Sequence, residues 1–537
     1  MRDFLPVLST PNTFRTNANG QPTPRPSNEM LINCTPLLLE NGLIGAAPRP
    51  QFTNGDFTPN SSLDRGRGIV SFKGDDYLYL DQDTYYYDGG SQDLNSTSAP
   101  GYAGNTGHWS EIIASFVKCF VSGDENLVIV NAGQPVSASG TTDGNVWYQS
   151  SPAATPSSID SANMPGNNGE KLIRGGAYLD GYLFVADDNG QIHNSNLNDI
   201  TTWTALDFIT AEREPDRGVY LGKHKDNIIY IGTRTIEFFY NAGNATGSPL
   251  ARRQDVSYRV GTAFPNSVVE AGDILYFAGT DAEGTQAIYK LENFQLSVIS
   301  DYRMNDAMQQ MPDINAGTGT SSLYQAWLAV CTMGGSPGLI FTYSSRFTYY
   351  YHAYTGRWTA WSYGAAPQFD GPITDSAGWA SIFPVVSHNN ISSSAGYYQF
   401  ANGWIGSPSL FHDDDAMNDL GQSNTPNVHM MFARWDGGTA KKKRINSVRA
   451  VTRSGPISSI NISADLYWAD YDKVPLSGYM NPPNSYSGGR SIDMGSAGGR
   501  VYRLGTTRER AFMLDWPLGH GTISIVVGLE IDYDIVE

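Results

Sequence analysis

A pair of short β-strands recurs through the middle of the chain at intervals of 46 to 55 residues. Each pair opens with an apolar run, and a short loop joins it to a second strand of similar character. The first strands begin at Leu78, Leu127, Tyr182, Ile228, Ile274 and Trp327. One such hairpin would leave an apolar face in water, whereas hairpins stacked radially bury both faces and protect their edges. A period of about 50 residues with paired strands therefore predicts a β-propeller.

Six blades follow from these pairs, and a run that begins at Tyr397 after a longer insertion would supply a seventh. We expect the propeller to occupy residues 66–428. Residues 1–65 include a proline-rich stretch without an apolar period, so an extended N-terminal arm is expected there. Residues 429–537 contain strands that alternate apolar and polar side chains, which predicts a C-terminal β-sandwich-like domain. The predicted fold class is all-β.

One helix is predicted as an insertion after Ser300. Met304, Met308 and Met311 fall on one helical face, and Pro312 ends the run.

Negative charge is unevenly distributed along the chain. The net charge is −18, whereas residues 430–537 carry 13 Lys and Arg against 11 Asp and Glu, a balance of +2 that leaves −20 for the remainder. An acidic body disfavours ordinary DNA binding, which requires cations that neutralise phosphates. It is compatible with a channel through which DNA slides, and more simply with solubility alone. A channel would predict acidic or neutral side chains on any DNA-facing surface.

The three cysteines, Cys34, Cys119 and Cys331, are odd in number and far apart. This pattern argues against a disulfide framework and indicates assembly in a reducing cytosol. The N-terminal residues lack the pattern of a secretory signal, and no apolar run approaches the roughly 18 residues that a membrane span requires. We therefore expect no membrane association.

Motifs for common chemistry are missing from the sequence. There is no HExxH, CxxC, nucleotide-binding GxGxxG or phosphate-binding loop. The GGSPG run at residues 334–338 matches GxSxG in letters only, because it leads into a strand and Pro337 follows the serine. The sequence thus predicts no enzyme, no catalytic residue, no cofactor or cofactor-binding residue, and no metal-binding residue.

Three groups of residues are candidate exceptions to this absence of chemical motifs. His412 and Asp413–Asp415 could hold a hard cation, but adjacent side chains of a strand diverge, which favours a solvated loop. Residues 141–147, TTDGNVW, imperfectly match the Asp-box turn of sialidase-type propellers, which is structural. The basic run Lys441–Arg444 is read as a solvated strand edge, with contact to phosphate or to an acidic partner as the sharper alternative.

Residues 228–291 carry a more specific signal. Thr235, Ile236, Glu237, Phe238 and Phe239 form a polar-x-Ile-Glu-aromatic-aromatic pattern; Gly243, then Val260–Thr262, then a strand across Gly284–Tyr289 follow it. This arrangement resembles the packaged-DNA stabilisation proteins of short-tailed bacteriophages (podoviruses), also called tail hub or nozzle proteins. The resemblance extends over residues 175–310, and the methionine-rich helix falls where the family has one. Insertions at residues 95–107 and 364–394 lengthen this chain.

The motif itself reads as a blade-packing element. Ile236 and Phe238 point to one face of a strand, whereas Glu237 and Phe239 point to the other. A buried Glu237 would need a cationic partner from another strand, because Arg234 is expected on the opposite face. Gly261 predicts either a close backbone approach or a positive φ.

The resemblance implies a structural virion protein of the phage tail, assembled in the host cytoplasm. It would form a homohexamer that docks below the portal-adaptor ring, extends the DNA channel and helps to retain packaged DNA until ejection. Tail fibres or spikes, and in some phages a needle or plug, would be further partners, and DNA would pass without sequence-specific binding. Two alternatives remain open: a carbohydrate-binding receptor module of the tail, and a propeller glycosidase with two carboxylates at the propeller's central mouth.

Overall fold

The computed structural model describes residues 1–7, 15–16, 22–23, 30–39, 42–57, 66–80, 83–87, 94–98, 113–121, 123–133, 144–166, 170–211, 213–309, 326–333, 336–343, 347–361, 385–389, 397–400, 405–409, 427–433, 435–454, 463–470, 487–493, 500–517 and 524–536.

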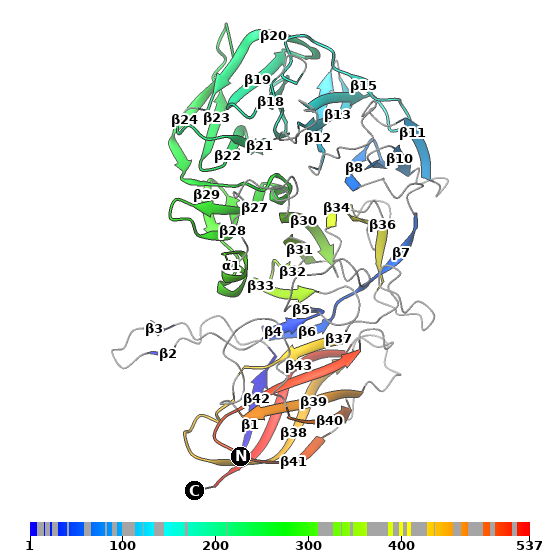
Figure 1. Ribbon diagram of the computed structural model, residues 1–537. Coiled ribbons are helices and arrows are strands. Elements are labelled where there is room, and N and C mark those ends of the chain that lie inside the picture. The colour runs from blue at the N-terminus through cyan, green and yellow to red at the C-terminus, as the bar shows by residue number, and fades with distance from the viewer. Residues whose placement is uncertain are drawn as a thin grey trace, which may run out of the picture.

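The described strands form a ring of seven blades, and a second β-structure lies beside blade 6 (Figure 1). Blade 1 contains β8 (Gly66–Phe72), β9 (Asp75–Leu80), β10 (Asp83–Tyr87) and β11 (Leu94–Ser98). Blade 2 contains β12 (Ser115–Val121), β13 (Asp124–Ala132), β14 (Gly144–Gln149) and β15 (Ser157–Ser158). Blade 3 contains β17 (Ala177–Leu179), β18 (Tyr182–Ala186), β19 (Gln191–Asn196) and β20 (Asp199–Thr210). Blade 4 contains β21 (Gly218–His224), β22 (Asn227–Gly232), β23 (Ile236–Asn241) and β24 (Leu250–Tyr258), with β16 (Arg174–Gly175) parallel to β21.

The remaining blades complete the ring. Blade 5 contains β27 (Ile274–Asp281), β28 (Gln286–Glu292) and β29 (Gln295–Val298), with the short strands β25 (Val260–Gly261) and β26 (Val269–Ala271) both paired to β27. Blade 6 contains β30 (Ala326–Met333), β31 (Ser336–Tyr343), β32 (Phe347–His352) and β33 (Arg357–Trp361). Blade 7 contains β34 (Val385–Asn389), β35 (Tyr397–Phe400), β36 (Ile405–Ser409) and, from the N-terminal region, β7 (Gln51–Phe57). The predicted propeller is confirmed, and the described strands form seven blades.

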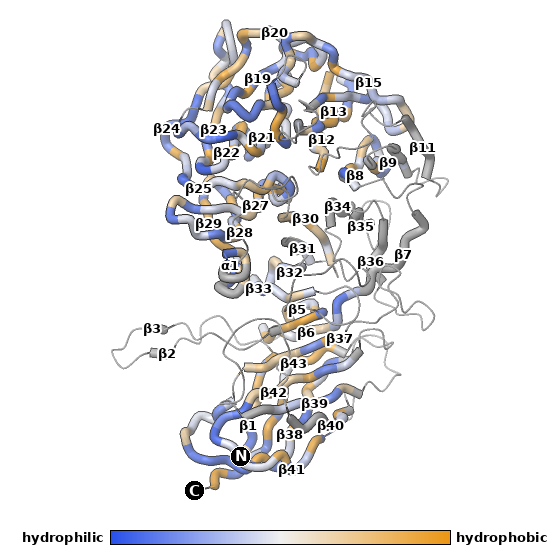
Figure 2. The backbone as a smooth tube through the Cα atoms, viewed as in Figure 1, coloured by the Kyte–Doolittle hydropathy of each residue, from blue (hydrophilic) through white to orange (hydrophobic). Residues whose placement is uncertain are grey.

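Apolar packing between neighbouring blades explains the ring. Each core cluster described within the propeller joins two neighbouring blades, as where Ile229 and Phe238 of blade 4 meet Phe277 of blade 5. Figure 2 shows hydrophobic residues concentrated along the strands. Removing this apolar area from water stabilises each contact by roughly 25 cal/mol per Å². The predicted helix is present as α1 (Tyr302–Gln309), whose Met304 and Met308 are buried between blades 5 and 6; Met311 and Pro312 lie outside the described residues.

The N-terminal region is not the extended arm that we expected. Besides β7 it contains β1 (Arg2–Pro6), β4 (Met30–Ile32), β5 (Cys34–Leu38) and β6 (Ile44–Pro48), which join larger sheets, and a two-stranded ribbon of β2 (Arg15–Thr16) and β3 (Pro22–Thr23). The physical reason is that the proline-rich stretch covers only residues 22–26, whereas Leu5, Leu31 and Ile44 are buried in a hydrophobic core.

The C-terminal domain is a β-sandwich, as predicted. Its strands are β37 (Asn427–Met431), β38 (Lys443–Ser454), β39 (Ser463–Asp470), β40 (Ser487–Asp493), β41 (Arg500–Thr507), β42 (Arg510–Pro517) and β43 (Ser524–Ile535). One sheet has the order β41-β38-β43-β6-β5, with β1 also paired to β43. The other runs β4-β37-β42-β39-β40 and continues through β4 into β33 of blade 6, so one sheet links the two domains.

A buried arginine stabilises the junction between propeller and sandwich. Asn33 has a positive φ of 56°, which asparagine tolerates, and its N–H donates to the carbonyl of Ala360 in blade 6 at 2.8 Å. The fully buried Arg49 donates through Nε to Oδ1 of Asn33 at 3.1 Å and through Nη1 to the carbonyl of Pro50 at 2.8 Å. Its guanidinium lies 5.7 Å from the ring centroid of Trp361. The two domains therefore meet through directed bonds as well as apolar contact.

Replacing Arg49 with alanine should lower the free energy of unfolding by about 3 kcal/mol, because buried acceptors lose their donor and the Trp361 ring loses its partner. Guanidinium denaturation followed by tryptophan fluorescence measures the change. The matched control Arg217→Ala removes an exposed arginine and should change stability by about 0.5 kcal/mol or less. Equal losses in the two variants would contradict the role assigned to Arg49.

Candidate functional site: blade motif, central crossing and basic pocket

The motif at residues 235–239 forms the start of β23, as the sequence predicted. Ile236 and Phe238 pack toward blade 5, and Phe239 packs toward blade 3. Thr235 is also buried, and its N–H and hydroxyl donate to the carboxylate of Asp216. The motif therefore joins three consecutive blades.

Glu237 is 1% exposed, and its partners come from other segments. Oε2 lies 2.7 Å from Nε of Arg252 on β24, and Oε1 accepts a hydrogen bond from the backbone N–H of Arg213 at 3.1 Å. Arg234 is exposed, so the expectation of a cation from another strand is confirmed. Burial raises the pKa of Glu237, while the Arg213 amide and the Arg252 guanidinium oppose that change.

Gly261 is explained by a close backbone approach, one of the two expected reasons. An ideal Cβ at this position would collide with the backbone N of Arg234 and lie 2.5 Å from the carbonyl oxygen of Gly232. Its φ is not positive, in contrast to Gly243 and Gly284. The missing side chain lets blade 5 begin against the backbone of blade 4.

A segment of blade 5 crosses the centre of the propeller. Between β25 and β26 the chain leaves the sheet and forms the 3-10 helix η1 (Pro265–Ser267), which is buried throughout. Oδ1 of Asn266 accepts a hydrogen bond at 2.9 Å from the N–H of Ile113, which directly precedes blade 2. Since blades 2 and 5 are not neighbours, this segment must span the space between them.

Arg174 holds the crossing segment from another side. This buried side chain donates through Nη1 to the carbonyls of Pro265 and, at 2.8 Å, Val268. Its guanidinium lies 5.6 Å from the ring centroid of Tyr220. Burial lowers the pKa of Arg174 to about 10, so it remains charged at neutral pH. Sequence reasoning missed Arg174 and Asn266, because their partners lie 91 and 153 residues away.

The basic run Lys441–Arg444 is divided between core and surface. Lys443 is buried, and its Nζ donates to the carbonyls of Thr439, Lys441 and Arg508 at 2.5, 2.8 and 2.8 Å. Lys441, Lys442 and Arg444 are exposed, but β38 pairs with both β41 and β43, so the run is solvated without lying at a sheet edge. One lysine thus supports the loop, and the other three cations remain on the surface.

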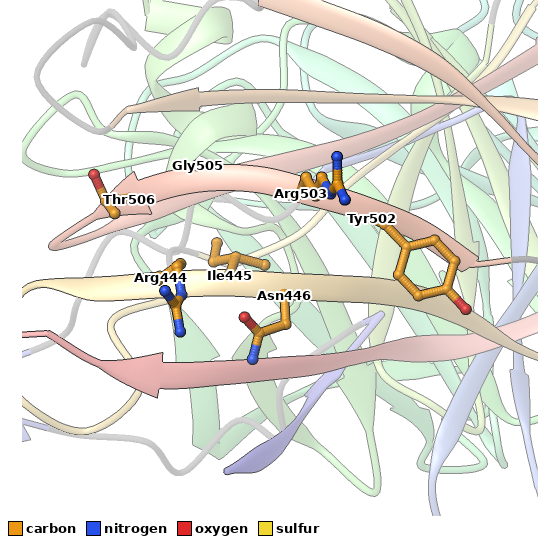
Figure 3. A pocket seen from close by; sticks show the side chains of 7 residues that line it. All are labelled: Arg444, Ile445, Asn446, Tyr502, Arg503, Gly505 and Thr506. Carbon is orange, nitrogen blue, oxygen red and sulfur yellow. The ribbon is translucent and has the colours of Figure 1, made fainter.

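A pocket of about 770 Å³ opens between β38 and β41 on the sandwich (Figure 3). Its lining includes Arg444 and Asn446 from β38, and Tyr502, Arg503 and Gly505 from β41. The described lining contains two guanidinium groups, an amide and a phenol, and the carboxylate of Asp534 at its border accepts hydrogen bonds from Arg444 and Asn446. Such a set of groups suits an anion.

A register shift creates this pocket. Ile445 pairs with Gly505 but Ser447 pairs with Tyr502, so two residues of β41 oppose one residue of β38. The extra residue keeps both Val501 and Leu504 in the core although they are three positions apart, and Tyr502 and Arg503 are both exposed. The shift thereby places an aromatic ring and a cation side by side on the outer face.

Of the other candidate sites named from the sequence, the structure describes only some residues. His412–Asp415 and Asp143 lie outside the described residues. Ser336 pairs with Met333 at a hairpin end, as expected for a turn. Within the part of the chain that the structure describes, no three His, Cys, Asp or Glu side chains gather to hold a metal ion, and no helix is long and apolar enough to cross a membrane.

Residues 141–388 match the family model described as "Bacteriophage P22 Gp10, beta-propeller". This region belongs to the phage stabilisation family. The match extends from blade 2 into β34 of blade 7 and includes the motif at 235–239, Gly261 and the central crossing. The resemblance found in the sequence is therefore confirmed over this region, and the match supports a phage structural protein of the P22 Gp10 kind, which implies a component of the virion.

The sequence matches no curated protein. Solved structures similar to the chain include the designed Ika8 protein, at 9% identity and a TM-score of 0.34 over 67% of this chain and 100% of that one. BamB from Moraxella catarrhalis has 12% identity and a TM-score of 0.33, over 64% of this chain and 95% of that one. The RRP9 WD40 repeats have 8% identity and a TM-score of 0.36, over 67% and 99%. The assignment above rests on the family match and the strand topology.

The raised pKa of Glu237 predicts a pH-dependent stability. The folded state holds this proton more tightly than the unfolded chain, so the resulting stabilisation is complete below pH 4.5 and is lost as the pH rises through the raised pKa. Wild type should therefore lose stability relative to Glu237→Gln between about pH 4 and pH 7. Denaturation midpoints of both proteins across this range provide the measurement. A wild type that gains on the glutamine variant would mean that pairing with Arg252 outweighs burial.

Gly261→Ala should lower the free energy of unfolding by about 3 kcal/mol, because the new methyl group meets backbone atoms that cannot move independently. The matched control is Gly284→Ala. Gly284 has φ of 86° but nothing within 4 Å of an ideal Cβ, so only conformational strain of about 1 kcal/mol is expected. Thermal or chemical denaturation distinguishes the two variants; a smaller loss at Gly261 would contradict the close approach.

Proposed function

We propose that this chain is the hub or nozzle subunit of a short phage tail, one that docks below the portal-adaptor ring and extends the DNA channel. The match of residues 141–388 to the phage stabilisation family carries this proposal. Six copies would form the ring, as the family resemblance implies, and closure would require head-to-tail contacts between different surfaces of neighbouring copies.

The architecture suits a subunit that must withstand the pressure of packaged DNA. Propeller and sandwich share one continuous sheet through β33, β4 and β37. The buried Arg49, Asn33 and Trp361 add directed contacts at the same place. Such a junction resists bending, because any rotation would break buried hydrogen bonds.

The central crossing bears on the path of the DNA. The segment around Asn266 and Pro265 is held by Ile113 on one side and by Arg174 on another. This segment obstructs the axis of the propeller itself. DNA would therefore run along the axis of the ring of subunits, and each propeller would form part of the wall. The fibres or spikes would attach to the outside of this wall.

The charge of the chain is compatible with such a wall. A body that carries −20 outside residues 430–537 repels phosphates, so DNA could slide without being held. We propose that acidic or neutral side chains face the channel.

Electron microscopy and native mass spectrometry of the purified chain with the portal-adaptor ring of its virion test the function. We expect six copies on one ring, with each component alone as a control. A stable monomer or trimer that ignores the ring would contradict the hub. It would direct attention to a carbohydrate-binding tail module or a propeller glycosidase, for which polysaccharide binding and cleavage would be assayed.

A further inference from the structure

The outer face of the sheet that contains β38, β41 and β43 has an excess of arginine over carboxylate. Arg449 lies 2.5 Å from Glu530, Arg2 lies 3.6 Å from it, and Arg500 lies 3.9 Å from it. One carboxylate is therefore shared among three guanidinium groups. This face retains positive charge in a chain whose net charge is −18.

The pocket on this face already holds a carboxylate at its border. Asp534 on β43 accepts hydrogen bonds from Nη2 of Arg444 at 2.9 Å and from Nδ2 of Asn446 at 3.1 Å. Both donors also line the pocket between β38 and β41. The pocket residues thus have the spacing and chemistry that carboxylate recognition needs.

Arg503 is the cation of this pocket for which no partner is found in the described part of the chain. Its φ is 60°, a conformation that glycine or asparagine adopts at lower cost. The cost of this conformation motivates a role for the arginine side chain. Tyr502 beside it is 59% exposed, so a large ring also stands open to solvent.

The edge of β41 is protected against the addition of another strand. Nη1 of Arg490 donates to the carbonyl of Tyr502 at 2.7 Å, and Nη1 of Arg510 donates to the carbonyl of Leu504 at 2.5 Å. These side chains occupy acceptors that an incoming strand would use. Recognition at this place therefore falls to the side chains of the pocket.

We propose that the pocket binds an Asp or Glu carboxylate on the acidic surface of a second copy of this chain. The proposal rests on the ring proposed above and names one of its subunit contacts. Arg503 would pair with the incoming carboxylate through its planar fork, and Tyr502 would cover the contact, while Arg444 stays paired with Asp534 at the border. The balance of −20 outside residues 430–537 supplies the complementary surface. A DNA strand is the less suitable occupant, because the same net charge repels a polyanion.

Sedimentation velocity of the full chain tests the pocket, with salt raised from about 50 mM to about 500 mM to screen charge pairs. The decisive variant is Arg503→Gly, which removes the cation while relieving the positive φ, so folding should be preserved; thermal denaturation checks this. The matched control is Arg234→Ala, another exposed arginine, on the propeller. A deca-glutamate peptide serves as competitor, and a labelled DNA duplex probes the alternative occupant.

We expect wild type and Arg234→Ala to self-associate alike, more weakly at high salt and with added peptide, and Arg503→Gly to associate at least 10-fold more weakly. Equal association of Arg503→Gly and wild type would overturn the pocket contact and leave the hub standing. A wild type that stays monomeric without the adaptor ring would also overturn the pocket contact. The hub would not be overturned by that result, because the subunits could still assemble on the ring. DNA binding that depends on Arg503, without self-association, would make this a phosphate site and overturn the proposal.

Discussion

The fold depends on how the first 57 residues are held between the two domains. Arg49 is fully buried at the point where the chain leaves β6 of the sandwich and enters β7 of blade 7. Its bonds to Asn33 and Pro50 fix this turn, and β7 then pairs with β36 to complete the last blade. The ring is thereby closed by a strand from the opposite end of the propeller sequence. Closure of this kind removes an open sheet edge and makes the stability of blade 7 depend on the junction.

The sequence predicted those parts of the fold that local patterns determine. Strands of a blade are neighbours in the chain, so the period of about 50 residues revealed the propeller without any long-range information. The sequence indicated blade 7 only as a possible seventh unit. Its strands β34 and β7 begin at Val385 and Gln51, so no local repeat connects them. The N-terminal arm was wrong for the same reason. A proline-rich stretch is visible in a sequence, whereas the partner of β1, which is β43 at the other end of the chain, is not.

At the site, too, local sequence patterns were predicted and contacts between distant residues were missed. Alternation along one strand placed Ile236, Phe238 and Glu237 correctly, and the high cost of a lone buried carboxylate required a cation from elsewhere. The sequence pattern could not identify Arg252 as that cation, because strand register is set by three-dimensional packing. The hydrogen bond between Asn266 and Ile113 had no signal in the sequence, since neither residue belongs to a motif and they are 153 positions apart.

Charged side chains are used differently in the propeller and in the sandwich. The propeller uses its buried charges internally: Arg174 binds carbonyls of the central crossing, and Arg252 neutralises Glu237. In the sandwich, Lys443 is likewise used inside, but a register shift turns Arg503 outward at a positive φ where a glycine would cost less. Glycine would adopt this conformation at lower cost, which motivates the role proposed for the Arg503 side chain. Among the described residues, the outer face of the sandwich therefore carries an exposed arginine at a positive φ, whereas the buried propeller charges named above are used within the fold.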